Sequence, residues 1–184
     1  MTRTRNRLNL AVLLAGLVLA TTPVAAQPAV HPDPTLLFYH LDEASHRRTQ
    51  LNGTAGLPRV RIGDAVVICF SAPQAGWVNL WSINPDGSFG LIYPNKFSGH
   101  GGNGAKIAAG EQYCMGEDES FRLRVRGEEG RSQIYLNWVA TEEALLAPEH
   151  FIDLFSQNEM QTSRTIRTHD LGRSDVYFSY TVME

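Results

Sequence analysis

The 184-residue chain has few cysteines and lacks the short motifs that mark most catalytic and metal sites. Only Cys69 and Cys114 are present, and there is no Cys-x-x-Cys pair of the kind found in zinc and thiol–disulfide motifs. The sequence also lacks a Gly-x-Ser-x-Gly elbow and a phosphate loop, and no two of its six histidines share a helical i, i+4 spacing. We therefore expect no catalytic residue, no cofactor and no metal ion.

The chain also has no excess of positive charge. It has 16 Lys and Arg residues against 19 Asp and Glu residues, and it contains no basic block. Without residues 1–26, which include three arginines and no acids, 13 basic residues would face 19 acidic ones, a net charge of about −6. Because nucleic acids and anionic lipids attract basic surfaces, the sequence argues against both as partners.

Long apolar runs are confined to the N-terminus. Residues 10–20 form a compact apolar segment, which follows Arg3, Arg5 and Arg7 and precedes small residues that end at Ala26. This order is typical of a secretory signal peptide, here residues 1–26. No other run approaches the ~20 apolar residues of a membrane-spanning helix. The sequence therefore predicts a periplasmic or secreted protein without a membrane span.

The clearest pattern in the chain is that of β-strands, and it is strongest over residues 63–95. Apolar, β-branched and aromatic residues fill 65–70 and 77–83. The segment 84–87, Asn-Pro-Asp-Gly, supplies the fixed φ of proline and the positive φ of glycine that tight turns need. Residues 88–93 then read as the returning strand of a hairpin. Proline at position 94 ends this strand, since proline cannot donate to a sheet.

Further strands are expected after this hairpin. Residues 121–126 alternate apolar residues with arginines, and residues 132–140 and 175–182 show similar alternation. We expect a mostly β fold, an antiparallel immunoglobulin-like β-sandwich over residues 58–184. Residues 27–57 are expected to be an extended linker and a mobile N-terminal segment. Thr141 and the two acids that follow it suggest a short helical insertion near the C-terminus, with a possible second helix over 149–155.

Three groups of residues are candidates for a site, and each has a plain structural alternative. Four aromatic residues could form a binding face or simply pack in the core. Three arginines could receive a carboxylate-bearing partner or lie on a solvated face. The two cysteines could form a disulfide after export or remain buried thiols. The candidates are Trp77, Trp81, Phe89, Tyr93, Arg122, Arg124, Arg126, Cys69 and Cys114.

The stretch from Gly63 to Asn95 resembles the bacterial family known as domain of unknown function 4384. The shared features are a Gly-Asp strand start, an aromatic strand, a Pro-Asp-Gly turn and a Leu-Ile-Tyr-Pro-Asn ending, and the likeness continues to about Ala140. The resemblance implies a β-rich envelope or accessory module without assigned catalytic residues. We therefore expect a non-enzymatic binding or assembly module of the bacterial cell envelope, whose partner is another envelope protein. A small exported hydrolase with convergent histidines and acids, or a small-ligand carrier that uses the aromatic strand face, is the alternative.

Overall fold

The structure is a computed structural model that describes residues 33–53, 56–96, 102–118, 121–147, 167–170 and 172–184. These residues form two β-sheets, and their only helical element is a 3₁₀ turn, η1 (Glu142–Ala144). The expectation of a mostly β fold is confirmed, whereas its immunoglobulin-like character stays a prediction. The expected signal peptide and the possible helix over 149–155 lie outside the described residues.

The first sheet, called sheet A, is built on the central strand β4, whose apolar run is buried on both faces. Its strands follow the order β2-β1-β4-β8, and β9 pairs with β4 beside β8. All of these pairs are antiparallel. The strands are β1 (Thr35–Asp42), β2 (Arg47–Gln50), β4 (Ala65–Ser71), β8 (Tyr113–Met115) and β9 (Leu123–Arg124).

The first two strands correct the expected domain boundary. β1 and β2 lie in the region expected to be a linker and a mobile segment, yet β1 pairs with β4 from Thr35↔Ser71 to His40↔Val66. Leu36 and Phe38 are buried in the core. The side chain of Asn52 fastens this region further, since it accepts a hydrogen bond from Phe38 N and donates one to the Leu36 carbonyl. The β-domain therefore includes residues from Thr35 onward, because long-range pairing orders a segment whose local sequence shows weak periodicity.

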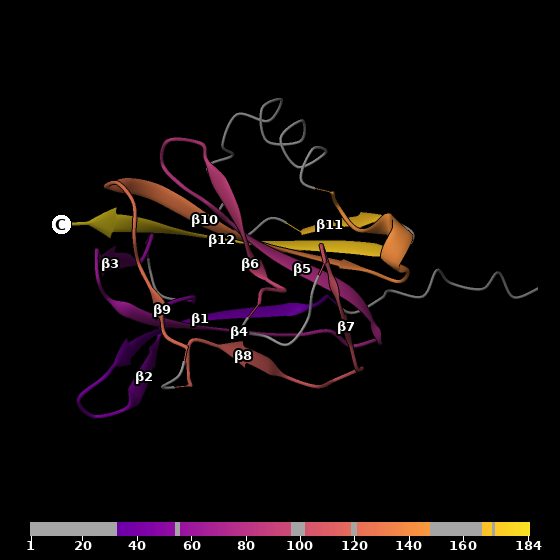
Figure 1. Cartoon of the computed structure of the whole chain (residues 1–184), viewed down its shortest axis with the longest axis horizontal. Helices are drawn as coiled ribbons and strands as arrows, with labels where there is room; N and C mark the ends of the chain where they lie inside the picture. The colour runs from indigo at the N-terminus through magenta and orange to yellow at the C-terminus, as the bar shows by residue number, and fades with distance from the viewer. Residues whose placement is uncertain (1–32, 54–55, 97–101, 119–120, 148–166, 171) are drawn as a thin grey trace, which may run out of the picture. The chain divides into compact units, whose positions relative to one another are not determined.

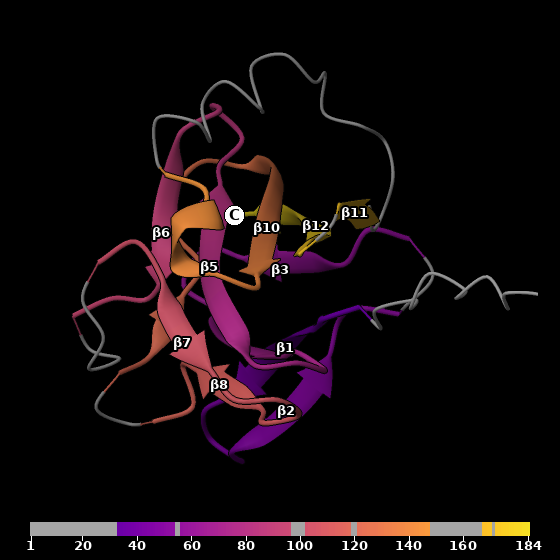
Figure 2. The same ribbon diagram turned by 90° about the vertical axis from the view of Figure 1, so that its right-hand side faces the viewer.

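The second sheet, called sheet B, contains seven strands in the order β11-β12-β10-β5-β6, with β3 beside β12 and β7 beside β5. Figure 2 shows β6, β5, β10 and β12 side by side. The β3–β12 pair is parallel and departs from the expected antiparallel arrangement at this position. The strands are β3 (Arg59–Arg61), β5 (Gly76–Ile83), β6 (Phe89–Tyr93), β7 (Ala105–Ile107), β10 (Gly130–Val139), β11 (Arg167–Asp170) and β12 (Arg173–Met183).

The turn between β5 and β6 follows the expected chemistry. Asn84 N donates to the Ser88 carbonyl at 2.8 Å, and Gly87 N donates back to the Asn84 carbonyl at 3.0 Å. Gly87 has a φ of 82°, a conformation that costs glycine little. Asp86 accepts hydrogen bonds from the Ser88 backbone and hydroxyl, which lower the pKa of its carboxyl group. The hairpin expected over residues 77–93 is therefore present.

The main hydrophobic core lies between the two sheets (Figure 1). Alternate side chains of β4 and β1 meet those of β10 and β12, because successive residues of a strand point to opposite faces. Phe38 and Phe178 lie across this interface with ring centroids 5.2 Å apart. Burying each such side chain stabilises the fold by about 1.5–3 kcal/mol. The core is formed by Leu36, Phe38, Val60, Val66, Ile68, Phe70, Ala72, Val78, Leu80, Tyr93, Ala105, Ile107, Met115, Val125, Ile134, Leu136, Trp138, Val176, Phe178 and Val182.

The edges of the sheets are broken into short pieces. On sheet B, β6 pairs with residues 80–83 of β5 and β7 with residues 76–78. At the opposite edge, β11 and β3 pair with separate parts of β12. On sheet A, β8 and β9 divide the edge of β4 in the same way.

The helical insertion expected after Thr141 is not present. Glu142–Ala144 make a single 3₁₀ turn, Thr141 makes no side-chain cap, and Leu145 is already extended. The reason lies in the next residue, because Asn137 accepts a hydrogen bond from Leu146 N and Asn79 donates one to the Leu146 carbonyl. These long-range hydrogen bonds hold the backbone of Leu146 against sheet B.

Candidate functional site

The two cysteines form a disulfide on the outer face of sheet A. Cys69 of β4 and Cys114 of β8 are paired in register, and their sulfur atoms are 2.07 Å apart. Cys69 is buried in a small apolar cluster with Leu41 and Val67. Because both sulfur atoms are bonded to each other, neither cysteine is available as a thiolate nucleophile or metal ligand.

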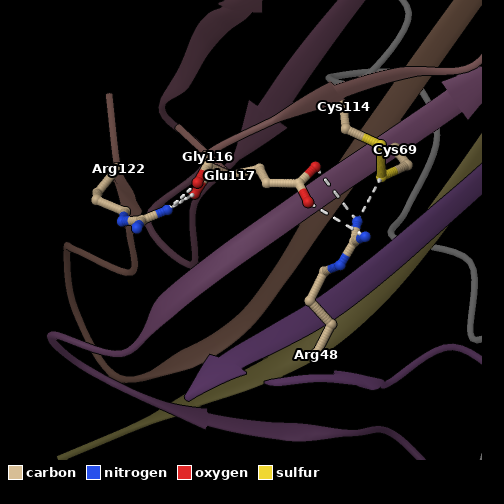
Figure 3. A network of polar contacts seen from close by, with 6 residues as sticks. All are labelled: Arg48, Cys69, Cys114, Gly116, Glu117 and Arg122. Atoms are coloured by element: carbon tan, nitrogen blue, oxygen red, sulfur yellow. Dashed lines mark hydrogen bonds and ion pairs between the residues drawn. A yellow bond between two sulfur atoms is a disulfide. The ribbon is translucent and has the colours of Figure 1, made fainter. Parts of the chain in front are cut away.

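Arg48 of β2 lies over this disulfide, as Figure 3 shows. Its guanidinium donates to Cys69 Sγ and pairs with Glu117 at 3.2 Å, and it also lies 5.7 Å from the centre of the Tyr39 ring. Both members of the ion pair are substantially exposed, so the pair stabilises the fold by less than about 1 kcal/mol. We interpret this group as a structural cover for the disulfide.

The three candidate arginines have different surroundings. Arg122 donates to the carbonyl groups of Gly116 and Glu117 (Figure 3). Arg124 donates to Glu43 at 2.8 Å and to the Gly63 carbonyl at 3.0 Å. Arg126 is exposed and makes no polar contact with the described residues. Of the strand expected over 121–126, only β9 forms.

The four candidate aromatic residues do not share one surface. Tyr93 is buried in the core between the sheets, 5.1 Å from the ring of Phe70. Trp81 and Phe89 belong to a separate cluster on the outer face of sheet B, and Trp77 is half-buried. Their role as a binding face stays a prediction.

A row of buried polar residues crosses the outer face of sheet B. Asn79, Asn137 and Asp175 are direct cross-strand neighbours on β5, β10 and β12. Asn137 Nδ2 donates to Asp175 Oδ1 at 2.7 Å, and the guanidinium of Arg173 pairs with Asp175 Oδ2 at 2.9 Å. Asn79 Nδ2 donates to the Leu146 carbonyl, and Asn137 Oδ1 accepts a hydrogen bond from Leu146 N. Asn79 Oδ1 has no hydrogen-bond partner among the described residues. The row therefore attaches a loop to the sheet.

Tyrosines extend this row along the sheet. Tyr135 is fully buried, its hydroxyl group accepts a hydrogen bond from Arg173, and its ring lies 4.5 Å from that of Tyr177. Burial, together with the charge of Asp175, raises the pKa of Tyr135 strongly and that of Tyr177 to about 12. Both hydroxyl groups therefore stay protonated near neutral pH.

A cavity of about 440 Å³ opens between the two sheets. Its deep walls are apolar side chains from both sheets, including Phe38, Ile68 and Ile134, which are almost fully buried. This volume falls within the range of about 300–1,000 Å³ that is usual for ligand sites. The remaining lining residues are Val66, Ser82, Asn84, Ile92, Leu123, Arg124, Val125, Arg126, Gly127 and Tyr180.

Polar and charged residues also belong to the lining of the cavity. Arg124 and Arg126 line it from the β9 side, and Ser82 and Asn84 line it from β5 and its turn. Two of the three candidate arginines are therefore among the lining residues. The lining thus combines apolar residues with a few polar ones, as in many binding sites.

Other kinds of site are not found in the described part of the chain. Residues 33–53, 56–96, 102–118, 121–147, 167–170 and 172–184 contain no group of three or more His, Cys, Asp or Glu residues that could hold a metal ion. Within the same ranges, no helix is long and apolar enough to cross a membrane.

Comparison with known families agrees with the pattern of strands and turns. Residues 59–143, from β3 to the η1 turn, match the family described as a domain of unknown function (DUF4384). The chain carries a DUF4384 domain. Within this domain lie β4, β5 and β9, which contribute to the cavity, whereas Phe38 and Tyr180 come from outside it. No match was found among curated proteins or solved structures.

Sequence reasoning missed the cavity and the polar row. The row had a usable signal, because Asn79 and Asn137 interrupt strands that are otherwise apolar and aromatic. A buried asparagine needs hydrogen-bond partners, so each interruption indicates a polar contact across the sheet. The cavity had no comparable signal, since its lining comes from seven separated parts of the chain.

Proposed function

We propose that the protein is an exported, non-enzymatic binding module of the bacterial cell envelope, and that it takes its ligand into the cavity between the two sheets. The observation that carries this proposal is the cavity itself, whose lining includes apolar residues such as Phe38 and Ile134. A hollow of this size within a β-domain supports binding of a small molecule.

The cavity distinguishes between the functions expected from the sequence. Its walls are buried between the sheets, which favours a small ligand over a flat contact with another envelope protein. The expected envelope-protein partner remains a separate prediction. The described residues that line the cavity include no carboxyl or imidazole group, so a hydrolase using histidines and acids has no support at this site.

The titratable groups that line the cavity are unsuited to proton transfer. Arginines stay charged in proteins. Burial raises the pKa of Tyr180, opposed by the hydrogen bond with Ser132, so this hydroxyl stays protonated at neutral pH. These residues can bind and orient a ligand, which supports the non-enzymatic part of the proposal.

Export is supported by two independent features. The N-terminal residues have the charge and hydropathy pattern of a signal peptide. The disulfide between Cys69 and Cys114 suits an oxidising compartment such as the periplasm.

Native mass spectrometry of the protein recovered from the bacterial envelope tests the proposal. We expect wild-type protein to retain a small molecule and Ser82→Phe, which fills the cavity, to lose it. Thr49→Phe is the matched control, because Thr49 is exposed on β2 and does not line the cavity. A ligand-free wild-type protein that also takes up no molecule from an envelope lipid extract would refute the proposed function, as would unchanged retention by Ser82→Phe.

A further inference from the structure

We propose that the Cys69–Cys114 disulfide exchanges with external thiols in one direction: the thiol attacks Cys114 Sγ, and Cys69 departs as a thiolate beside Arg48. The co-reactant is a dithiol, such as the reduced active site of an envelope thiol–disulfide oxidoreductase. This inference is independent of the proposed function, because neither cysteine lines the cavity. It assigns Cys114 as a site of covalent modification.

The strand order of sheet A gives the two sulfur atoms different surroundings. Leu37, Cys69 and Cys114 are direct cross-strand neighbours on β1, β4 and β8, so they form one row on the outer face of the sheet. β8 is the last strand in this order, and in the described residues no further strand pairs with its outer edge. The row therefore continues past Cys69 and ends at Cys114.

The direction of attack follows from this row. The attacking sulfur approaches in line with the bond that breaks, from the side opposite the leaving sulfur. Attack on Cys69 Sγ would come from the side of β1, where Leu37 lies in the row and the Arg48 guanidinium contacts this sulfur (Figure 3). Attack on Cys114 Sγ comes from the sheet border beyond β8. Only 1% of the surface of Cys69 is exposed, whereas Cys114 is half-buried, so access also selects Cys114.

Arg48 makes Cys69 the better leaving group. Its Nη1 atom lies 3.9 Å from Cys69 Sγ, and a guanidinium beside sulfur stabilises the thiolate form. Burial alone disfavours a thiolate, so the departure of Cys69 depends on this cation. Glu117 pairs with the same guanidinium at 3.2 Å, but its side chain is 52% exposed, so water screens its charge.

The exchange consists of two displacements, in which two electrons pass from the dithiol to the protein. In the first, one thiolate of the dithiol bonds to Cys114 Sγ, the Cys69–Cys114 bond breaks, and its electron pair leaves on Cys69. In the second, the other thiolate attacks the dithiol sulfur that is bonded to Cys114, and Cys114 leaves. The dithiol becomes a disulfide, and its two protons pass through solvent to the sulfur atoms of Cys69 and Cys114.

Trapping of the mixed disulfide identifies the sulfur that is attacked. Oxidised wild-type protein is incubated with reduced glutathione, a monothiol, at several concentrations, then alkylated with N-ethylmaleimide and mapped by peptide mass spectrometry. We expect at least about ten-fold more glutathione on Cys114 than on Cys69, and a rate proportional to the thiol concentration. A preference for Cys69, no preference, no adduct, or a rate independent of glutathione would overturn the inference.

Reduction by dithiothreitol, a small dithiol, tests the role of Arg48. We expect Arg48→Gln to be reduced at least about three-fold more slowly than the wild type, because the departing thiolate loses its cation. Arg48→Lys keeps the charge and should restore most of the rate. Arg47→Gln is the matched control, since Arg47 is exposed on the same strand and makes no polar contact with the described residues. Equal or faster reduction of Arg48→Gln, or equal slowing by Arg47→Gln, would show that Arg48 does not assist the departure of Cys69.

Discussion

Asn137 and Asp175 face each other across the β10–β12 pair, and Asn137 Nδ2 donates a hydrogen bond of 2.7 Å to Asp175 Oδ1. Both residues are at least 97% buried. Asn137 also accepts a hydrogen bond from the backbone N–H of Leu146. One side chain therefore joins two strands of sheet B to the segment that follows η1.

Removal of this side chain should be costly. We expect Asn137→Ala to lower the free energy of unfolding by about 2–3 kcal/mol, because it leaves buried polar groups without partners. Asn103→Ala is a suitable control, since the Asn103 side chain is exposed, and it should change the value by less than about 0.5 kcal/mol. Urea denaturation followed by tryptophan fluorescence measures both. Equal stability of the two variants would contradict a structural role for the polar row.

The disulfide should contribute strongly to stability. Cys69 and Cys114 are 45 residues apart in sequence, and a cross-link over such a loop restricts the unfolded chain. We expect the double variant Cys69→Ala/Cys114→Ala to lose about 2–4 kcal/mol in denaturant titrations. Reductant should destabilise the wild type by a similar amount and leave the double variant unaffected. If reductant lowers the stability of both proteins equally, the disulfide is not the cause.

Two glycines with similar backbone conformations should respond differently to alanine. Gly63 and Gly116 have φ values of 95° and 86°. A Cβ at Gly63 would meet nothing within 4 Å, whereas one at Gly116 would lie 2.4 Å from the Val66 carbonyl oxygen. Gly63→Ala should therefore cost about 1–2 kcal/mol from the backbone conformation alone.

Gly116→Ala should cost at least about 1 kcal/mol more than Gly63→Ala, because the clash with β4 adds to the same strain. Thermal denaturation of both variants under identical conditions gives the comparison. Similar melting temperatures would show that β4 and the loop containing Gly116 move apart without penalty.

The stability of sheet B should depend on pH in the alkaline range. Burial, which has the larger effect, and the charge of Asp175 raise the pKa of Tyr177 from 10.0 to about 12. A pKa that is higher in the folded state means that the protonated form is favoured by folding. The contribution of the Tyr177 hydroxyl to the free energy of unfolding is therefore complete below pH 10 and disappears as the pH rises toward 12.

We expect Tyr177→Phe to lose less stability between pH 10 and 12 than the wild type. The pKa of Tyr135 is also raised in the folded state, so part of the loss of stability at alkaline pH should remain in this variant. Denaturant titrations at several pH values measure the difference. Parallel curves for the two proteins would contradict the raised pKa of Tyr177.

The sequence predicted features whose causes are local. The apolar run of β4, the β5–β6 hairpin and its Asn-Pro-Asp-Gly turn depend on residues within a few positions of one another. The cysteine pair could be proposed as a disulfide because both residues were expected in strands, although only the register between β4 and β8 decides it. The family resemblance came from the same local patterns.

Features with distant causes were missed or wrongly predicted. β1 depends on pairing with β4, about 30 residues away, and the expected helix at Glu142 is replaced by an extended segment held by Asn79 and Asn137. Arg126 was a candidate because of its alternation with apolar residues. Its place beside a cavity, however, depends on side chains from both sheets, including Phe38 and Tyr180, and no local pattern encodes such a hollow.

The fragmentation of the sheet edges has a consequence for behaviour in a crowded compartment. A foreign strand can elongate a sheet only along a continuous row of unpaired backbone groups. In the described residues, three sheet borders each consist of two short strands: β6 and β7, β11 and β3, and β8 and β9. The remaining border strand, β2, has four residues, two of them arginines. The described part of the fold thus offers no long template for amyloid-like polymerisation.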